Sequence, residues 1–180
     1  MSGPVGDNTA RASGVIAAAG GGKVLQVGSA TKTDTFSTTS VTPLIITGLT
    51  VTLTPTSASS KFLILAKVHM HNGGSYGNFT DLFTDVGGGG HAIVSGFRGD
   101  ASGSRRRTAS MQAINEKAGF DVHLNYLDSP STTSDVTYAA YGSPSESGHA
   151  YKCNQEYSNT NVIHVGSAAS TITVMEIDGS

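Results

Sequence analysis

The stretch KFLILAKVHMH, residues 61–71, decides the fold class. Its first half is almost continuous in Phe, Leu and Ile, as expected for a β-strand buried between two layers. A second apolar run, LIITGLTVTL at 44–53, precedes it as two pieces around Gly48, and Pro55 and a serine cluster at 57–60 lie between the runs. These turn-forming residues predict a hairpin in which 61–71 is the central buried strand.

Shorter apolar or alternating runs continue in both directions from this pair. They span residues 23–29, 33–40, 76–86, 91–97, 109–114, 120–126, 136–141, 151–153, 162–165 and 170–177. Glycines at 87–90 and a polar loop at 100–107 separate some of them, and within this part of the chain 115–118 has the pattern of a helical turn. About ten strands without an intervening helical period predict an antiparallel, jelly-roll-like β-sandwich, an all-β fold.

Composition excludes several classes of function. Charged residues make up only 13% of the chain, too few for the outer faces of long amphipathic helices. A net charge of −2 gives no field that would attract nucleic acid or an anionic membrane, so neither is an expected partner. The single cysteine, Cys153, has no partner for an internal disulfide and lacks the companions of a zinc site. We therefore expect no cofactor and no membrane insertion.

Residues 1–22 differ from the rest and predict a separate N-terminal arm, followed by one β module at 23–180. The arm has a polar opening, an apolar piece at 15–19 and three glycines at 20–22. Its apolar piece is too short for a signal peptide or a membrane span, so we expect the protein to be made and assembled in a cytosol. An arm this small orders by docking on a partner protein or on a sister subunit.

The motifs associated with catalysis all have simpler interpretations. Ser75 lies in a G-x-S-x-G pattern at 73–77, but no helix pattern follows it, as a hydrolase nucleophile requires. The glycines at 20–22 precede Lys23, yet position 17 is Ala17, so the spacing of a phosphate-binding loop is absent. The aspartates have no fixed partners for glycosidase chemistry. We expect a protein that is not an enzyme.

Two other groups are candidate binding residues. His69 and His71 are two apart and share one face of a strand, so three copies around a trimer axis would offer six nitrogens to a metal ion. We expect instead that the strand has left the core by His69, which would leave both imidazoles solvated. Arg105, Arg106 and Arg107 could hold a phosphate, a sulfate or an acidic glycan, although such a short run is usually a solvated loop.

Four stretches together resemble a family of virion structural and tail-fibre proteins of cyanophages and other marine phages. They are KVLQVGSATKTDTF (23–36), TGLTVTLTPTSASSKFLILAKV (47–68), LNYLDSPSTTSDVTY (124–138) and STITVMEI (170–177). The resemblance implies a structural protein of a tailed bacteriophage, displayed on the virion surface. Residues 1–22 would attach it to neighbouring virion proteins, although fibres of this family often carry a longer N-terminal stalk.

Within this class, a tail-fibre or host-recognition appendage is favoured over capsid decoration. We expect a homotrimer, because the apolar residues at 44–46 and 62–65 exceed what one small sandwich can hide. Loops at 71–76, 87–90, 99–107 and 142–148 are expected to face outward and contact a host surface glycan. The recognition residues chosen from these loops and their borders are Asn72, Tyr76, Arg105, Arg106, Arg107 and Tyr141.

Two rival functions remain open. A glycan depolymerase would need converging carboxylates and aromatic platforms, and this chain has no Trp and only 7% aromatic residues. A free carbohydrate-binding module would be recognised as a soluble monomer.

Overall fold

The computed structural model describes residues 23–72, 77–112, 119–156, 163 and 166–179, and every structural statement below concerns this part of the chain. It contains eleven strands and one short 3₁₀ helix. They are β1 (Val24–Lys32), β2 (Phe36–Thr38), β3 (Leu44–Leu53), β4 (Lys61–Asn72), β5 (Asn78–Val86), β6 (Ala92–Ile93), η1 (Ser95–Phe97), β7 (Ser110–Gln112), β8 (Gly119–Asp128), β9 (Val136–Pro144), β10 (Tyr151–Cys153) and β11 (Ser170–Ile177).

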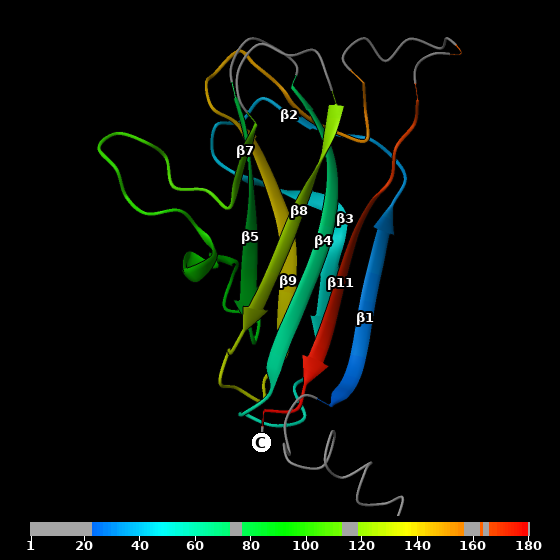
Figure 1. Cartoon of the computed structure of the whole chain (residues 1–180), viewed down its shortest axis with the longest axis vertical. Helices are drawn as coiled ribbons and strands as arrows, with labels where there is room; N and C mark the ends of the chain where they lie inside the picture. Colours follow the sequence, from blue (N-terminus) through cyan, green and yellow to red (C-terminus); the bar gives the residue numbers. More distant parts are fainter. Residues whose placement is uncertain (1–22, 73–76, 113–118, 157–162, 164–165, 180) are drawn as a thin grey trace, which may run out of the picture.

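The strands form two antiparallel sheets that face each other (Figure 1). One sheet has the order β1-β11-β4-β10-β2, with β8 on the other side of β4; the second has the order β3-β9-β5-β6, with β7 also pairing β5. The pairs are nested along the chain: β1 with β11, β3 with β9, β4 with β8, and β5 with β6 and β7. This nesting is the connectivity of a jelly roll, so the predicted fold class is confirmed.

The predicted hairpin between the runs at 44–53 and 61–71 is wrong. β3 pairs with β9 and β4 pairs with β8 and β11, so the two strands belong to opposite sheets. The turn between them crosses the sandwich, which lets Val51 and Phe62 both point into the core. The two pieces around Gly48 form one strand with a bulge, because Gly48 has a φ of +86° and the register shifts between Ile45 and Thr50.

Several short elements differ in extent from their predictions. The run at 33–40 supplies only the three residues of β2, and the run at 91–97 becomes β6 followed by η1. Polar, turn-forming residues occupy most of the first run, and only residues 36–38 in its middle pair with β10. The predicted helical turn at 115–118 lies outside the described residues, as do 162, 164 and 165 of the run at 162–165.

The core lies between the two sheets. Its largest fully buried side chains include Tyr138, Tyr151, Phe62, Ile46 and Leu49. Tyr151 packs so closely on the opposite sheet that a Cβ at Gly142 would lie 2.5 Å from its ring. Position 142 of β9 therefore requires glycine. Next to it, the hydroxyl groups of Tyr151 and Thr80 form a hydrogen bond of 3.0 Å.

A buried carboxylate lies near the C-terminal end of β11, and this end of the strand is at the lower end of the sandwich in Figure 1. Glu176 of β11 is fully buried and accepts hydrogen bonds from the backbone N–H and the hydroxyl of Thr56, both at 2.7 Å, and from Gln26 Nε2 at 2.6 Å. Burial raises its pKa, but the surrounding groups of Ser60, Thr56 and Gln26 outweigh this and lower the pKa to about 2. Glu176 therefore fixes the turn between β3 and β4 as an anion.

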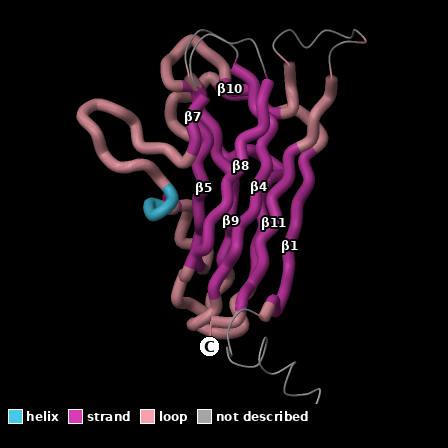
Figure 2. Tube along the Cα trace, viewed as in Figure 1, coloured by secondary structure: helices cyan, strands magenta, loops and turns pink. Residues whose placement is uncertain are grey.

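The two ends of the sandwich are built differently (Figure 2). Both ends of the described module meet at the lower end, where the backbone N–H of Asp178 donates to the carbonyl of Lys23 at 2.8 Å. The upper end carries the short strands β2 and β10, labelled in Figures 1 and 2 respectively, and the connection from β9 to β10. Residue 23, which follows residues 1–22, therefore lies at the end of the sandwich opposite to β2 and β10.

Candidate functional site

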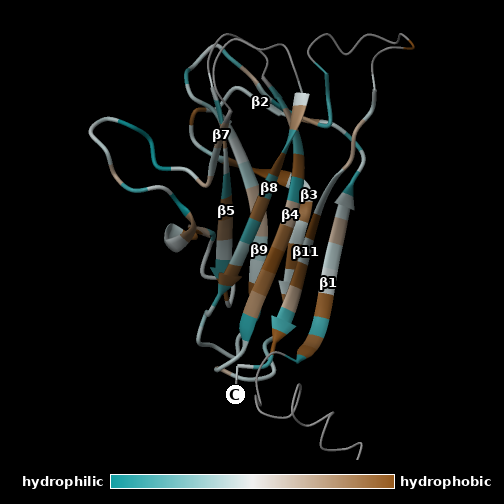
Figure 3. Cartoon of the chain, viewed as in Figure 1, coloured by the Kyte–Doolittle hydropathy of each residue, from teal (hydrophilic) through white to brown (hydrophobic). Residues whose placement is uncertain are grey.

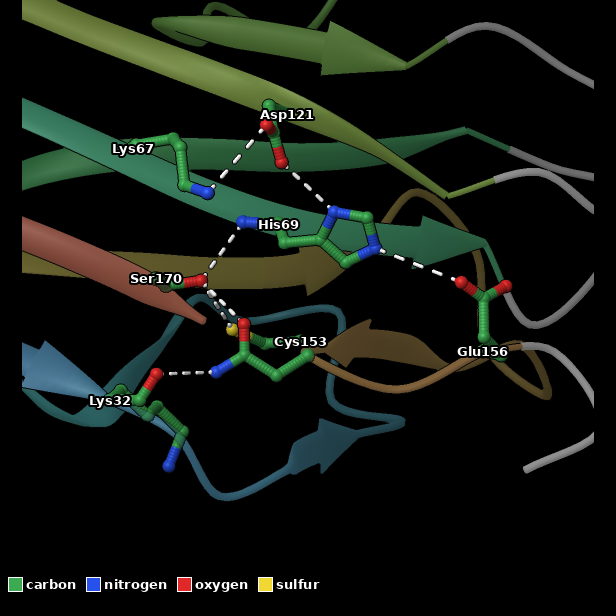
Figure 4. A network of polar contacts seen from close by, with 8 residues as sticks. Lys32, Lys67, His69, Asp121, Cys153, Glu156 and Ser170 are labelled. Carbon is green, nitrogen blue, oxygen red and sulfur yellow. Dashed lines mark hydrogen bonds and ion pairs between the residues drawn. The ribbon is translucent and has the colours of Figure 1, made fainter. Parts of the chain in front are cut away.

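A polar network at the upper end of the six-stranded sheet gathers side chains from β4, β8, β10 and β11 and from the segment after β10 (Figure 4). We call it the upper polar network; its members are Lys67, His69, His71, Asp121, Cys153, Asn154, Glu156 and Ser170. The strands place them together because β4 pairs with β8, β10 and β11 along its length.

His69 is held by carboxylates on two sides. Its Nδ1 lies 2.9 Å from Asp121 Oδ1, and its Nε2 lies 4.0 Å from Glu156 Oε1. The hydrogen bond from His69 lowers the pKa of Asp121, and Lys67, whose ammonium is 3.7 Å from Asp121 Oδ2, lowers it further. Asp121 therefore orients the imidazole and keeps Nε2 directed toward Glu156.

His71 overturns the expectation that both imidazoles are solvated. Its side chain is fully buried, and its Nε2 lies 3.9 Å from Glu156 Oε2. β4 continues to Asn72 with a partner strand on each side, Lys152 of β10 and Gly119 of β8 lying opposite His71. Among the described residues, no group of three or more His, Cys, Asp or Glu side chains is placed to hold a metal ion.

Gly119 leaves room for the neighbouring side chains of His69 and Glu156. A Cβ at this position would lie 2.8 Å from His69 Nε2 and 3.6 Å from Glu156 Oε1. Any side chain there would displace the imidazole or the carboxylate. Glu156 was not among the candidate residues from sequence, because it comes from a connection whose path no periodic pattern predicts.

Asn154 fixes the segment that carries Glu156. Its backbone has a φ of +55°, a left-handed conformation that asparagine tolerates better than most residues. Its Nδ2 donates to the carbonyls of Lys32 and Asp34, at 2.9 and 3.1 Å, and its Oδ1 accepts from the hydroxyl of Ser170 at 2.7 Å. One buried amide thereby connects β1, β11 and the connection after β10.

Cys153 and Ser170 also make structural contacts within the upper polar network. Burial raises the pKa of the Cys153 thiol, and its sulfur lies 3.5 Å from Ser170 Oγ. The Ser170 hydroxyl accepts from the backbone N–H of His69 at 2.9 Å while it donates to Asn154. Both groups are thus engaged in structural contacts, with the thiol in its protonated form.

The three arginines point to different partners. Arg105 is exposed, its backbone closing a bridge with Ser102, and Arg107 Nε donates to the carbonyl of Gly99 at 2.7 Å. Arg106 turns inward, with its guanidinium carbon 4.5 Å from the centre of the Phe79 ring. The run is therefore not one anion-binding cluster, because Arg106 is drawn to the sheet by a buried carboxylate.

That carboxylate is Asp81, which lies in the middle of β5 and is only 1% exposed. Its Oδ1 accepts from the backbone N–H of Ala109 at 2.8 Å and lies 3.4 Å from Arg98 Nε, and its Oδ2 lies 4.0 Å from Arg106 Nη2. Asp81 thus holds both ends of the excursion from 94 to 109 against the sheet. In the sequence, Asp81 is one of several aspartates for which no partner can be predicted.

Tyr141 lies inside β9 rather than in a loop, because that strand continues to Pro144. Its ring stacks on Phe83 at 3.8 Å between centroids, and His91 approaches its edge at 5.7 Å. Burial and the nearby Asp85 raise its pKa. The result is a half-exposed aromatic group on the outer face of the five-stranded sheet.

The other predicted recognition residues are dispersed. Asn72 is the last residue of β4, and Ser75 and Tyr76 lie outside the described residues. The connection at 145–150 is at the upper end, the 87–90 turn is at the lower end, and the 99–107 loop projects from the side (Figure 1). The four predicted loops therefore do not form one surface, since successive jelly-roll connections alternate between the two ends.

Fold and site together define a jelly-roll β-sandwich whose most concentrated polar groups form the upper polar network. In the described part, no helix has the length and apolar character needed to cross a bilayer. No protein-family model matches the sequence, and no curated protein is detectably similar to it.

Distant likenesses exist among solved viral structures. The crystal structure of the infectious bursal disease virus VP2 subviral particle has a TM-score of 0.41 and 13% sequence identity, covering 86% of this chain and 42% of that chain. Structures of the Gx and Gt strains of the same virus have TM-scores of 0.38 and 0.36, both at 12% identity, covering 87% and 85% of this chain. The chain spans 42% and 40% of those two chains, less than half in each case.

Proposed function

We propose that this protein is a non-enzymatic structural component of a tailed-phage virion, displayed at the particle surface as a homotrimer. In this proposal the protein is a tail-fibre or host-recognition appendage. Residues 1–22 join it to neighbouring virion proteins, and the opposite end and one side contact a host glycan.

The observation that carries the proposal is the structural difference between the two ends of the module. Residue 23 and Asp178 are tied together at the lower end, and the anionic Glu176 fixes the adjacent turn there. At the upper end, the segment after β10 is fastened by Asn154 to a rigid sheet. A module held at one end with its connections on a firm support at the other is suited to display.

The chemistry of the exposed groups favours a neutral or weakly acidic glycan. Tyr141 offers a half-exposed ring beside Asp85 and His91, and Arg105 is a free-standing cation on the lateral loop. Such rings and side chains bind sugars by stacking and hydrogen bonds without needing a deep pocket. The low net charge fits a partner that is recognised at close range.

Copy number on the particle tests the proposal. Cryo-electron microscopy of virions that contain the protein should place trimers at the tail, with on the order of tens of copies per particle. Copies in the hundreds on the capsid would assign it to capsid decoration instead. Absence from purified particles, or glycan cleavage by the isolated protein, would overturn the structural role.

A further inference from the structure

The outer face of the six-stranded sheet carries an apolar row near the lower end. Val27, Met175, Leu63 and Leu127 lie directly opposite one another on β1, β11, β4 and β8. Val27 is 55% exposed, Leu127 is 50% exposed, and the two central side chains are partly exposed. We call these four residues the apolar row; Figure 3 colours hydrophobic residues brown, and brown segments are present in the lower parts of β1 and β4.

The apolar part of this outer face is limited to a short length of the strands. The next outward positions are Ser29, Thr173, Leu65 and Asn125. A shallow pocket extends upward from the row, and the residues that line it include Met175, Thr173, Leu65, Asn125, Lys67 and His123. Four adjoining apolar side chains on one face of a strand layer indicate a surface that another segment covers.

Residues 12–22 have the length and composition to cover the row. They carry no charge, and VIAAA at 15–19 is followed by glycines at 20–22 that permit a reversal of direction. Val27 lies about 13 Å along β1 from residue 23. Residues 20–23, if extended and running back alongside β1, span about the same distance. Three strand spacings of about 4.8 Å, some 14 Å in all, separate β1 from β8, and five extended residues cover about 16 Å.

We propose that residues 12–22 fold back over the apolar row of their own chain, with Val15 and Ile16 as the principal contacts. The polar residues 1–11 then remain available to neighbouring proteins. This inference concerns the isolated chain and does not depend on the virion assignment, so either can fail without the other.

The rate of methionine oxidation measures directly whether residues 12–22 shield the apolar row from solvent. In the full-length chain, hydrogen peroxide should convert Met175 to its sulfoxide slowly, and the double variant Val15→Ser/Ile16→Ser should raise this rate about threefold or more. Met111 is 56% exposed on the other sheet and provides an internal standard whose rate should not change. The matched control Val5→Ser should leave both rates as they are. An unchanged Met175 rate in the double variant would overturn the proposal.

A disulfide trap identifies which chain supplies the segment. Ile16→Cys combined with Leu127→Cys should form a bond within one chain, visible as a monomer with altered mobility on a non-reducing gel. Ile16→Cys combined with Thr52→Cys, which places the second thiol on an exposed position of the other sheet, should not form it. A dimeric product from the first pair would assign the cover to a second copy and contradict docking within one chain.

Discussion

Replacing Glu176 with glutamine should destabilise the protein strongly at neutral pH and much less in acid. The carboxylate is fully buried and accepts three hydrogen bonds from Thr56 and Gln26. Glutamine has nearly the same shape, but it substitutes a donor for one acceptor oxygen and removes the charge. At least one of the surrounding donors would then face another donor.

The magnitude follows from the pKa of the carboxyl group. Folding lowers it from 4.5 to about 2, and each pKa unit corresponds to about 1.4 kcal/mol, so ionised Glu176 contributes about 3 kcal/mol at pH 7. Because the folded pKa is the lower one, this stabilisation is complete above about pH 4.5 and is lost as the pH falls toward 2. About 1 kcal/mol remains at pH 3.

Urea unfolding followed by circular dichroism measures this effect, since the chain has no Trp for fluorescence. The loss of unfolding free energy in Glu176→Gln should be about 3 kcal/mol at pH 7 and clearly smaller at pH 3. Glu146→Gln, a change at an exposed carboxylate, serves as the control and should have little effect at either pH. Equal destabilisation of Glu176→Gln at both pH values would refute the role of the charge.

Three further predictions concern packing, the lateral loop and assembly. Gly142→Ala should cost about 1–3 kcal/mol of unfolding free energy, because its Cβ would lie 2.5 Å from the ring of Tyr151; an unchanged urea midpoint would contradict this contact. Arg106→Ala should speed hydrogen exchange across 94–109, because the buried Asp81 loses a nearby, partly buried cation, whereas the exposed Arg105→Ala should not; equal effects of the two changes would contradict a role of Arg106 in holding the loop. Light scattering of the purified chain at micromolar concentration should give the mass of a trimer, and a monodisperse monomer would exclude it.

The basis for expecting a trimer changes with the structure. Ile46, Phe62 and Ile64, which were counted as surplus apolar surface, are fully buried in a single chain. Leu44 and Leu65 remain exposed, at 44% and 37%, so the apolar surface left for a partner is smaller than the sequence indicated. A run of apolar letters gives the number of such side chains but does not say which of them face the core.

The local hydrophobic pattern of the sequence was sufficient to predict the fold class, but it was insufficient to predict which strands pair. The alternation in 170–177 predicted β11 with its inward Ile172 and Val174. The partner of β3 could not be predicted, because a turn between sheets and a hairpin turn have the same composition. Strand pairing in a jelly roll depends on contacts distant in sequence, which no local window contains.

The same limit applied to the candidate site. His69 and His71 were selected because they share a strand face, and the structure places them together. His71 is buried where β4 has a partner strand on each side, and both imidazoles lie near Glu156; neither feature is visible in the strand's own sequence. Asp81 was overlooked because its partners, Arg98 and Arg106, return to it through an irregular excursion.

The pairing of β1 with β11 determines when the protein can fold during synthesis. β11 lies between β1 and β4, so the six-stranded sheet has no continuous centre until β11 has left the ribosome. Until then the first strands expose open edges and apolar faces, the condition in which β-rich chains aggregate. We therefore expect folding to begin only after translation passes 170–177, and slow production or a chaperone to improve the yield of native protein.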